Sequence, residues 1–105
     1  WVSNHAGRQF DAAPAPIEVL PGIRAAVGPD YPLIFYSGIS GGLDILRAIA
    51  LGADFVMLGR AFHYGLAAFG PAGAAHVVHI LREDLKSNLG QMGLAGYEGL
   101  AARLR

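Results

Sequence analysis

The chain has 105 residues, the size of one small domain, and its 53% hydrophobic and 15% charged content excludes an intrinsically disordered protein. Eight basic and eight acidic residues cancel, so there is no basic field to attract nucleic acid. The absence of cysteine excludes disulfides, thiolate catalysis and cysteine-ligated zinc. No run approaches the roughly 20 apolar residues that a membrane-spanning helix needs, so we expect no such helix.

Short apolar runs alternate with helical patterns along the chain. Three of these runs predict strands, at residues 1–3, 33–36 and 55–58. Helical spacing and glycine stops predict helices over residues 17–27, 43–51, 61–69 and about 72–92, with a short helix and a frayed end after residue 93. This alternation predicts an α/β fold with parallel strands and right-handed crossovers, in which functional loops follow the carboxyl end of each strand.

The loop after the first strand reads SNHAGRQFD over residues 3–11. His5 and Arg8 lie three residues apart in it and could converge on one small anion. The Arg8 guanidinium presents a fork of donors that matches a carboxylate, and the His5 imidazole can move a proton near neutral pH. The alternative is that both side chains are only surface or capping groups.

Two further loops combine glycine with polar groups. Residues 36–42 read YSGISGG before a helix, where glycines can present N–H groups to an anion; the alternative is a tight turn that simply needs glycine. After the third strand, Gly59 and Arg60 open a helix. A close N–H group and a guanidinium at that position form a phosphate clamp, although the bare dipeptide also fits an ordinary helix start.

Together these three loops resemble the signature of the FMN-dependent 2-hydroxy-acid oxidoreductases, and the likeness extends over about residues 1–92. The resemblance implies that residues 1–105 are an incomplete C-terminal segment, the last three β/α units of a TIM (β/α)8 barrel with parallel strands. It implies that His5 is the catalytic base and that Arg8 binds the substrate carboxylate. The implied FMN contacts are Tyr36, Ser37, Gly38, Ser40, Gly59 and Arg60.

Three positions depart from the family pattern. Ala6 stands where the family usually has glycine, Tyr36 where an aspartate holds the flavin ribityl chain, and Ser40 where an arginine reaches the phosphate. Losing one arginine–phosphate pair removes a charge-assisted hydrogen bond of roughly 1.5–3 kcal/mol. The resemblance therefore implies weaker FMN binding at these positions.

The implied reaction is the FMN-dependent oxidation of a small 2-hydroxy acid, such as L-lactate, to the 2-oxo acid. The implied partners are the missing N-terminal portion of the barrel and further copies of the full enzyme in a homo-oligomer. The implied location is cytoplasmic or peripheral at the inner face of the membrane. Because the N-terminal portion is missing, we expect the isolated chain to be inactive. Two alternatives stay open: another FMN- or phosphate-binding barrel enzyme, and a non-catalytic remnant that serves as a structural fragment.

Polar residues on the long helix are assigned to its solvated face. His76, His79 and Glu83 share one side of that helix, but a metal site needs convergent ligands and a supporting second shell. Asp84 and Lys86 are also expected to face solvent. We therefore expect no metal site on this helix.

Overall fold

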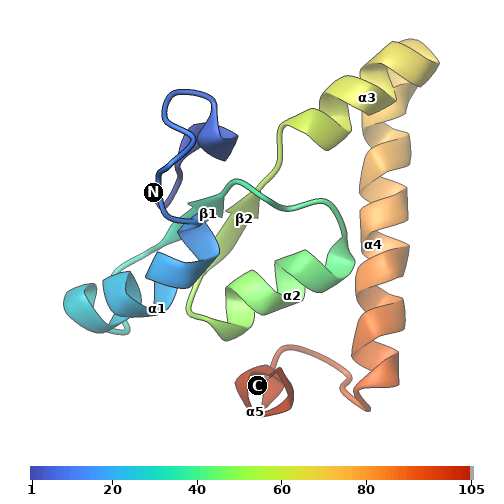
Figure 1. Ribbon diagram of the computed structural model, residues 1–105. Coiled ribbons are helices and arrows are strands. Elements are labelled where there is room, and N and C mark those ends of the chain that lie inside the picture. Colours follow the sequence, from blue (N-terminus) through green and yellow to red (C-terminus); the bar gives the residue numbers. More distant parts are fainter. Residues whose placement is uncertain (105) are drawn as a thin grey trace.

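A computed structural model describes residues 1–104, and its centre is a small parallel sheet. Strand β1 (Ile34–Tyr36) pairs in parallel with β2 (Phe55–Met57). On the other side of β1, Val2 forms a parallel bridge with Phe35. Both strands point to the same edge of the molecule, the upper edge in Figure 1. The prediction of an α/β fold with parallel strands is confirmed.

The predicted helices are all present, with ends that shift by about one residue. They are α1 (Pro16–Val27), α2 (Gly42–Ala50), α3 (Arg60–Phe69), α4 (Gly73–Gln91) and the short α5 (Leu100–Arg103). Two single turns of 3-10 helix, His5–Gly7 and Gly70–Ala72, were not predicted. The first lies in a loop and the second separates α3 from α4, so neither carries the longer periodicity that marks a helix in sequence.

The helices α1 and α2 cover one face of the sheet and leave the other face open (Figure 1). Phe35, only 1% exposed, points into the covered face, where it packs with Leu20 and Ala48. Side chains alternate along a strand, so the neighbours of Phe35 and their partners on β2 occupy the opposite face. There Phe55 is 68% and Met57 42% exposed. The sheet therefore has an apolar core on one face only.

A single guanidinium ties together the edge of the sheet opposite the functional loops. Arg24 donates to the carboxylate of Asp54 at 2.6 Å. It also donates to four backbone carbonyls, those of Gly28, Pro29, Tyr31 and Gly52. Asp54 accepts the Leu33 N–H at 2.7 Å, and this bond together with Arg24 holds the pKa of Asp54 below its usual value. The starts of both strands are therefore anchored to α1.

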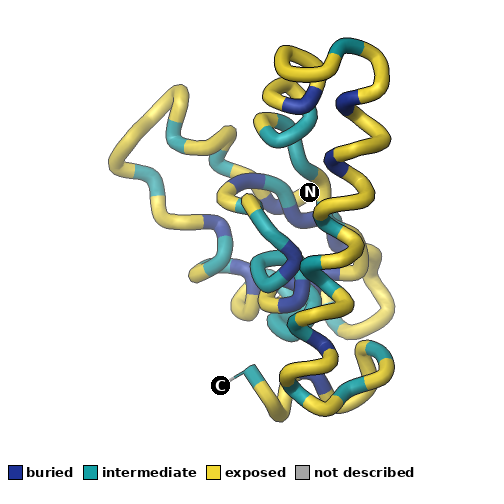
Figure 2. The backbone as a smooth tube through the Cα atoms, turned by 90° about the vertical axis from the view of Figure 1, so that its right-hand side faces the viewer, coloured by how far each residue is buried: buried dark blue, intermediate teal, exposed yellow. Residues whose placement is uncertain are grey.

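The helices α3 and α4 form a hairpin that folds back at residues 70–72 (Figure 1). By length and composition alone, residues 60–91 are apolar enough to cross a membrane, which the sequence analysis did not anticipate. Gly70 breaks this stretch with a φ of 60°, and Gly65 touches Gly73 across the turn. The stretch is therefore two packed helices. Figure 2 shows most of both helices as exposed, with few buried positions along their length.

Candidate functional site

The three loops singled out in the sequence meet at the carboxyl edge of the sheet. A small hollow there is lined by Ala6 from the first loop, residues 36–39 from the second, and residues 57–60 from the third. The Ala6 N–H donates to the Ser37 hydroxyl at 3.1 Å, so the first two loops are in direct contact. The loop of His5 and the helix start at Arg60 therefore share one edge of the sheet.

The His5 ring lies between two side chains of its own loop. Arg8 Nη1 is 3.5 Å from His5 Nε2, and Gln9 Nε2 is 3.3 Å from His5 Nδ1. A neutral imidazole has one donor and one acceptor nitrogen, so its two neighbours play opposite roles. With the Gln9 amide oxygen turned toward Nδ1, that oxygen accepts the Nδ1 proton. His5 Nε2 then carries a lone pair on the side of Arg8.

Strained backbone is concentrated at this edge. Among the described residues, the non-glycine residues with positive φ are His5 (56°), Ala6 (56°) and Ser37 (103°). Residues with a side chain rarely adopt such backbone angles. Each one costs of order 1–3 kcal/mol and persists only where the surrounding structure enforces it. Ser37 is also 7% exposed, a buried polar residue. The local structure therefore holds this loop pair in a defined shape.

A larger hollow lies beside Arg60 and has a volume of about 330 Å³. Its walls come from the second loop and the first turns of α3, namely Gly38, Ile39, Ser40, Arg60, Ala61 and Tyr64. Within residues 1–104, Arg60 makes no ion pair and no side-chain hydrogen bond. A free guanidinium at the start of a ten-residue helix is suited to hold a phosphate group.

In the glycine turn, residues 36–42, carboxylates already accept backbone N–H groups. Asp44 Oδ2 accepts the N–H groups of Ser40 and Gly41 at 3.0 and 3.2 Å, and the Ser40 hydroxyl at 2.9 Å. Burial alone would raise the pKa of Asp44, but these bonds outweigh it and hold that pKa below its usual value. Asp84 from α4 accepts the N–H of Gly42. A phosphate at this helix start would have to displace these carboxylates.

Tyr36 fills the space between the second and third loops. A Cβ added to Gly59 would lie 2.6 Å from the Tyr36 hydroxyl, and the rings of Tyr36 and Trp1 meet nearly at a right angle with centroids 6.3 Å apart. The hollow that remains there, about 20 Å³, has room for roughly one water molecule. The hollow of about 330 Å³ beside Arg60 therefore has room for a phosphate group, whereas the hollow of about 20 Å³ beside Tyr36 has not.

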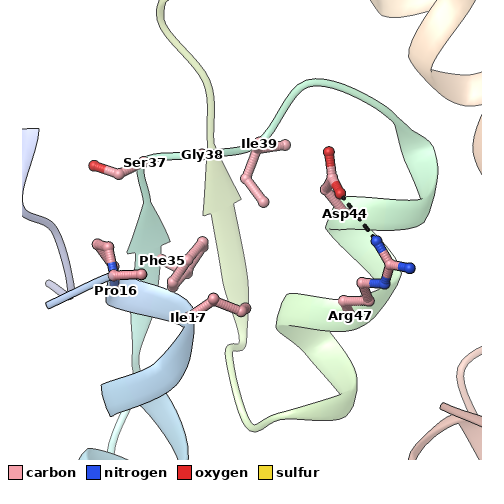
Figure 3. A pocket seen from close by; sticks show the side chains of 9 residues that line it. Pro16, Ile17, Phe35, Ser37, Gly38, Ile39, Asp44 and Arg47 are labelled. Atoms are coloured by element: carbon pink, nitrogen blue, oxygen red, sulfur yellow. Dashed lines mark ion pairs between the residues drawn. The ribbon is translucent and has the colours of Figure 1, made fainter. Parts of the chain in front are cut away.

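A further hollow of about 200 Å³ lies between α1 and α2 (Figure 3). It is mostly apolar, with Pro16, Ile17 and Phe35 on one side and the Asp44–Arg47 ion pair at 3.5 Å on the other. None of the predicted catalytic or substrate-binding side chains lines it. We therefore do not assign the chemistry to this hollow.

Two parts of the site were missed by the sequence analysis. Asp84 does not face solvent as predicted: it is half-buried, accepts the Gly42 N–H and is held by Asn88 Nδ2 at 2.9 Å. The hydroxyl of Ser3 lies 3.1 Å from that of Ser37. The Gly42–Asp84 bond joins residues that are 42 positions apart in sequence, and the Ser3–Ser37 contact joins residues that are 34 positions apart. No local pattern in the chain signals either contact. Lys86 instead pairs with an exposed carboxylate on its own helix, as expected for a solvated side chain.

The geometry defines a class of protein: an α/β module that carries an imidazole–guanidinium pair and a helix that begins with an arginine at one edge of a parallel sheet. A family model described as FMN-dependent dehydrogenase matches residues 1–104. The chain belongs to this FMN-dependent family of oxidoreductases, as its resemblance to the 2-hydroxy-acid enzymes implied.

Individual relatives agree with this assignment. The chain is 47% identical over 94 residues to an L-lactate oxidase of Alicycliphilus denitrificans, covering 90% of this chain and 26% of that protein. It is 45% identical over 100 residues to a pre-mycofactocin synthase of Mycobacterium tuberculosis, covering 95% of this chain and 25% of that protein. The chain thus spans about a quarter of the length of these relatives.

Solved structures give the same result. A soluble mutant of the membrane-associated (S)-mandelate dehydrogenase of Pseudomonas putida superposes with a TM-score of 0.88 at 44% identity, over 95% of this chain and 28% of that one. A lactate oxidase of Pediococcus acidilactici also reaches 0.88, at 40% identity, over 96% of this chain and 28% of that one. The fold of the segment is therefore the fold of the matching part of these enzymes.

Proposed function

We propose that this chain supplies the base, substrate-carboxylate and FMN-phosphate loops of an FMN-dependent 2-hydroxy-acid dehydrogenase or oxidase, as the last three β/α units of a TIM barrel. The observation that carries the proposal is that the loop of His5 and Arg8 and the free guanidinium of Arg60 lie at one edge of the sheet. The remaining FMN contacts are assigned to Tyr36, Ser37, Gly38, Ser40 and Gly59.

In this mechanism Arg8 binds the carboxylate of the 2-hydroxy acid through two parallel N–H···O bonds, which fixes the substrate beside the imidazole. His5 Nε2, 3.5 Å from Arg8 Nη1, uses its lone pair to take a proton from the substrate. Gln9 holds the opposite ring nitrogen and so selects the tautomer that can act as base. FMN, when bound, would supply the two-electron oxidant, taking up the two electrons and the second proton that the substrate loses on becoming the 2-oxo acid. Arg60 compensates the charge of its phosphate.

The substrate class is a small 2-hydroxy acid, and the relatives support a shared chemistry more than one substrate. Enzymes named for lactate, mandelate and pre-mycofactocin match this segment at 40–47% identity. The segment thus carries the carboxylate and proton-transfer groups, and the missing N-terminal portion selects the rest of the substrate. We place the full enzyme in the cytoplasm or at the inner face of the membrane, as a homo-oligomer.

A chimera tests the proposal. In it, this segment replaces the corresponding quarter of the L-lactate oxidase that it resembles. We expect a yellow protein whose flavin bleaches anaerobically with L-lactate. His5→Gln should lower kcat about 10²–10⁴-fold, because the proton then has no acceptor. Arg8→Lys should raise KM roughly 10–100-fold, because the bidentate contact is lost. His79→Gln, on the exposed side of α4, is the matched control and should change neither constant.

The chimera also separates the alternatives. A yellow protein that no 2-hydroxy acid bleaches would favour another FMN- or phosphate-binding barrel enzyme. A folded, colourless chimera would favour the non-catalytic remnant. Two contacts favour the non-catalytic remnant. Tyr36 fills the space beside Gly59, and the Ser40 hydroxyl is hydrogen-bonded to Asp44. Tyr36→Asp should then restore the colour by opening that space.

A further inference from the structure

The first two loops are joined by a small network of hydroxyl groups. The His5 N–H donates to the Ser3 hydroxyl at 3.0 Å, and the next amide, that of Ala6, donates to the Ser37 hydroxyl at 3.1 Å. The two hydroxyl oxygens are 3.1 Å apart, so one donates to the other. Each oxygen thus has a defined partner on the protein. Figure 3 shows the Ser37 side chain directed away from Asp44 and Arg47.

The network binds the backbone of two residues with strained φ angles. His5 and Ala6 are consecutive residues with φ of 56°, an arrangement that L residues avoid as a run. The two N–H groups that the network binds belong to these same residues. The turn around His5 and Ala6 is closed by the Gly7 N–H, which donates to the Asn4 carbonyl at 3.1 Å. Among the described contacts, the two hydroxyls are the partners of the His5 and Ala6 amides themselves. The direction of the His5 side chain depends on that backbone.

We propose that Ser37 is a positioning residue for His5: its hydroxyl, with that of Ser3, locks the left-handed turn that directs the imidazole beside Arg8. This inference rests on the proposed function for its catalytic consequence, but the lock itself is a property of the fold. Because the hydroxyl serves the first loop, the FMN contact proposed above for Ser37 falls to its backbone. The strained φ of 103° at Ser37 then follows from the need to bring its hydroxyl within reach of the first loop.

Ser37→Ala and Ser37→Gly in the chimera test the proposal. Both remove the hydroxyl, but glycine also relieves the positive φ, so the pair separates loss of the bond from backbone strain. The readouts are hydrogen exchange of residues 4–9, the dissociation constant of FMN, and the split between kcat and KM. We expect exchange of the Ala6 amide to be roughly three- to tenfold faster in both variants, as for the loss of one hydrogen bond. We expect kcat to fall about tenfold or more, with FMN affinity within twofold of the parent. Ser87→Ala, on the exposed side of α4, is the matched control.

Each outcome decides the matter. Unchanged exchange in both variants overturns the proposal. A loss that appears in Ser37→Ala but not in Ser37→Gly overturns it too, since the turn would then keep its shape without the hydroxyl once the φ of residue 37 is relaxed. Weaker FMN binding with unchanged exchange assigns the hydroxyl to the cofactor instead. If the parent chimera is folded but inactive, the proposed function fails, while the exchange rates still show whether Ser37 holds the loop. Ser3→Ala should reproduce the faster exchange at the adjacent His5 amide.

Discussion

Ala6 has a left-handed backbone (φ 56°, ψ 35°), and a side chain there costs about 1–2 kcal/mol. The family pattern has glycine at this position, a residue that adopts the same angles freely. The alanine therefore stores strain in the loop that carries His5. The hydroxyls of Ser3 and Ser37 offset that strain locally.

Ala6→Gly should stabilise the protein. We expect a gain of roughly 0.5–1 kcal/mol, since the relief of strain exceeds the added freedom of the unfolded chain. The measurement is the thermal unfolding midpoint of the chimera. Ala12→Gly, in the same loop but at negative φ, should lower that midpoint. A lower midpoint for Ala6→Gly would show that this turn is not strained.

At the scale of elements, close glycine contacts set the position of α4. Gly42, the first residue of α2, lies against the backbone of Asp84 and Leu85 on α4. Gly65 of α3 meets Gly73 of α4. Leu46 of α2 and Leu89 of α4 add a second apolar core with Leu100. Because α4 carries the carboxylate that binds the Gly42 N–H, its packing also determines which donors the glycine turn leaves for a phosphate.

Gly73→Ala should destabilise the hairpin. The new methyl group would overlap the carbonyl of Gly65, and overpacking of this kind costs typically 1–3 kcal/mol. Gly90→Ala is the matched control, since it lies in the same helix with nothing near its missing Cβ. It should gain roughly 0.5–1 kcal/mol from better helix propensity. Urea unfolding of the chimera measures both changes, and equal midpoints for the two variants would contradict the assigned contact.

The order of the elements could be predicted from sequence because it depends on local periodicity. An apolar run such as residues 33–36 signals a strand, and helical spacing such as that over about residues 72–92 signals a helix, without knowledge of the fold. The roles of Asp84 and Ser37 could not be predicted, since both depend on contacts with residues far along the chain. The fit at Tyr36 also depends on a neighbour, Gly59, which only the paired strands bring close. Loop composition thus predicted which loops form the candidate site, and tertiary contacts decide which groups in it are available.

At the scale of the whole molecule, the sheet is covered on one side only. Trp1, Phe55 and Met57 are exposed large apolar residues, and β2 is an edge strand among residues 1–104. Contiguous apolar surface and open strand edges promote association. In the proposed barrel, the other β/α units would cover both.

The isolated chain should therefore self-associate. We expect sedimentation at micromolar concentration to show dimers or larger species. Phe55→Lys should shift the chain toward the monomer, because a charge on the bare face resists pairing. Tyr31→Lys is the control, since Tyr31 is also exposed but lies at the opposite edge of the sheet. A parent chain that stays monomeric at every concentration would contradict this reading of the open face.

The five bonds of the Arg24 guanidinium hold the end of the sheet opposite the candidate site. The contacts that secure the scaffold and the groups proposed for catalysis therefore lie at opposite ends of the strands. Substitutions at Tyr36 or Ser40 should change the candidate cofactor site without unfolding the protein, because the Arg24 bonds do not involve those side chains. In such an arrangement, stability and activity can be altered independently of one another.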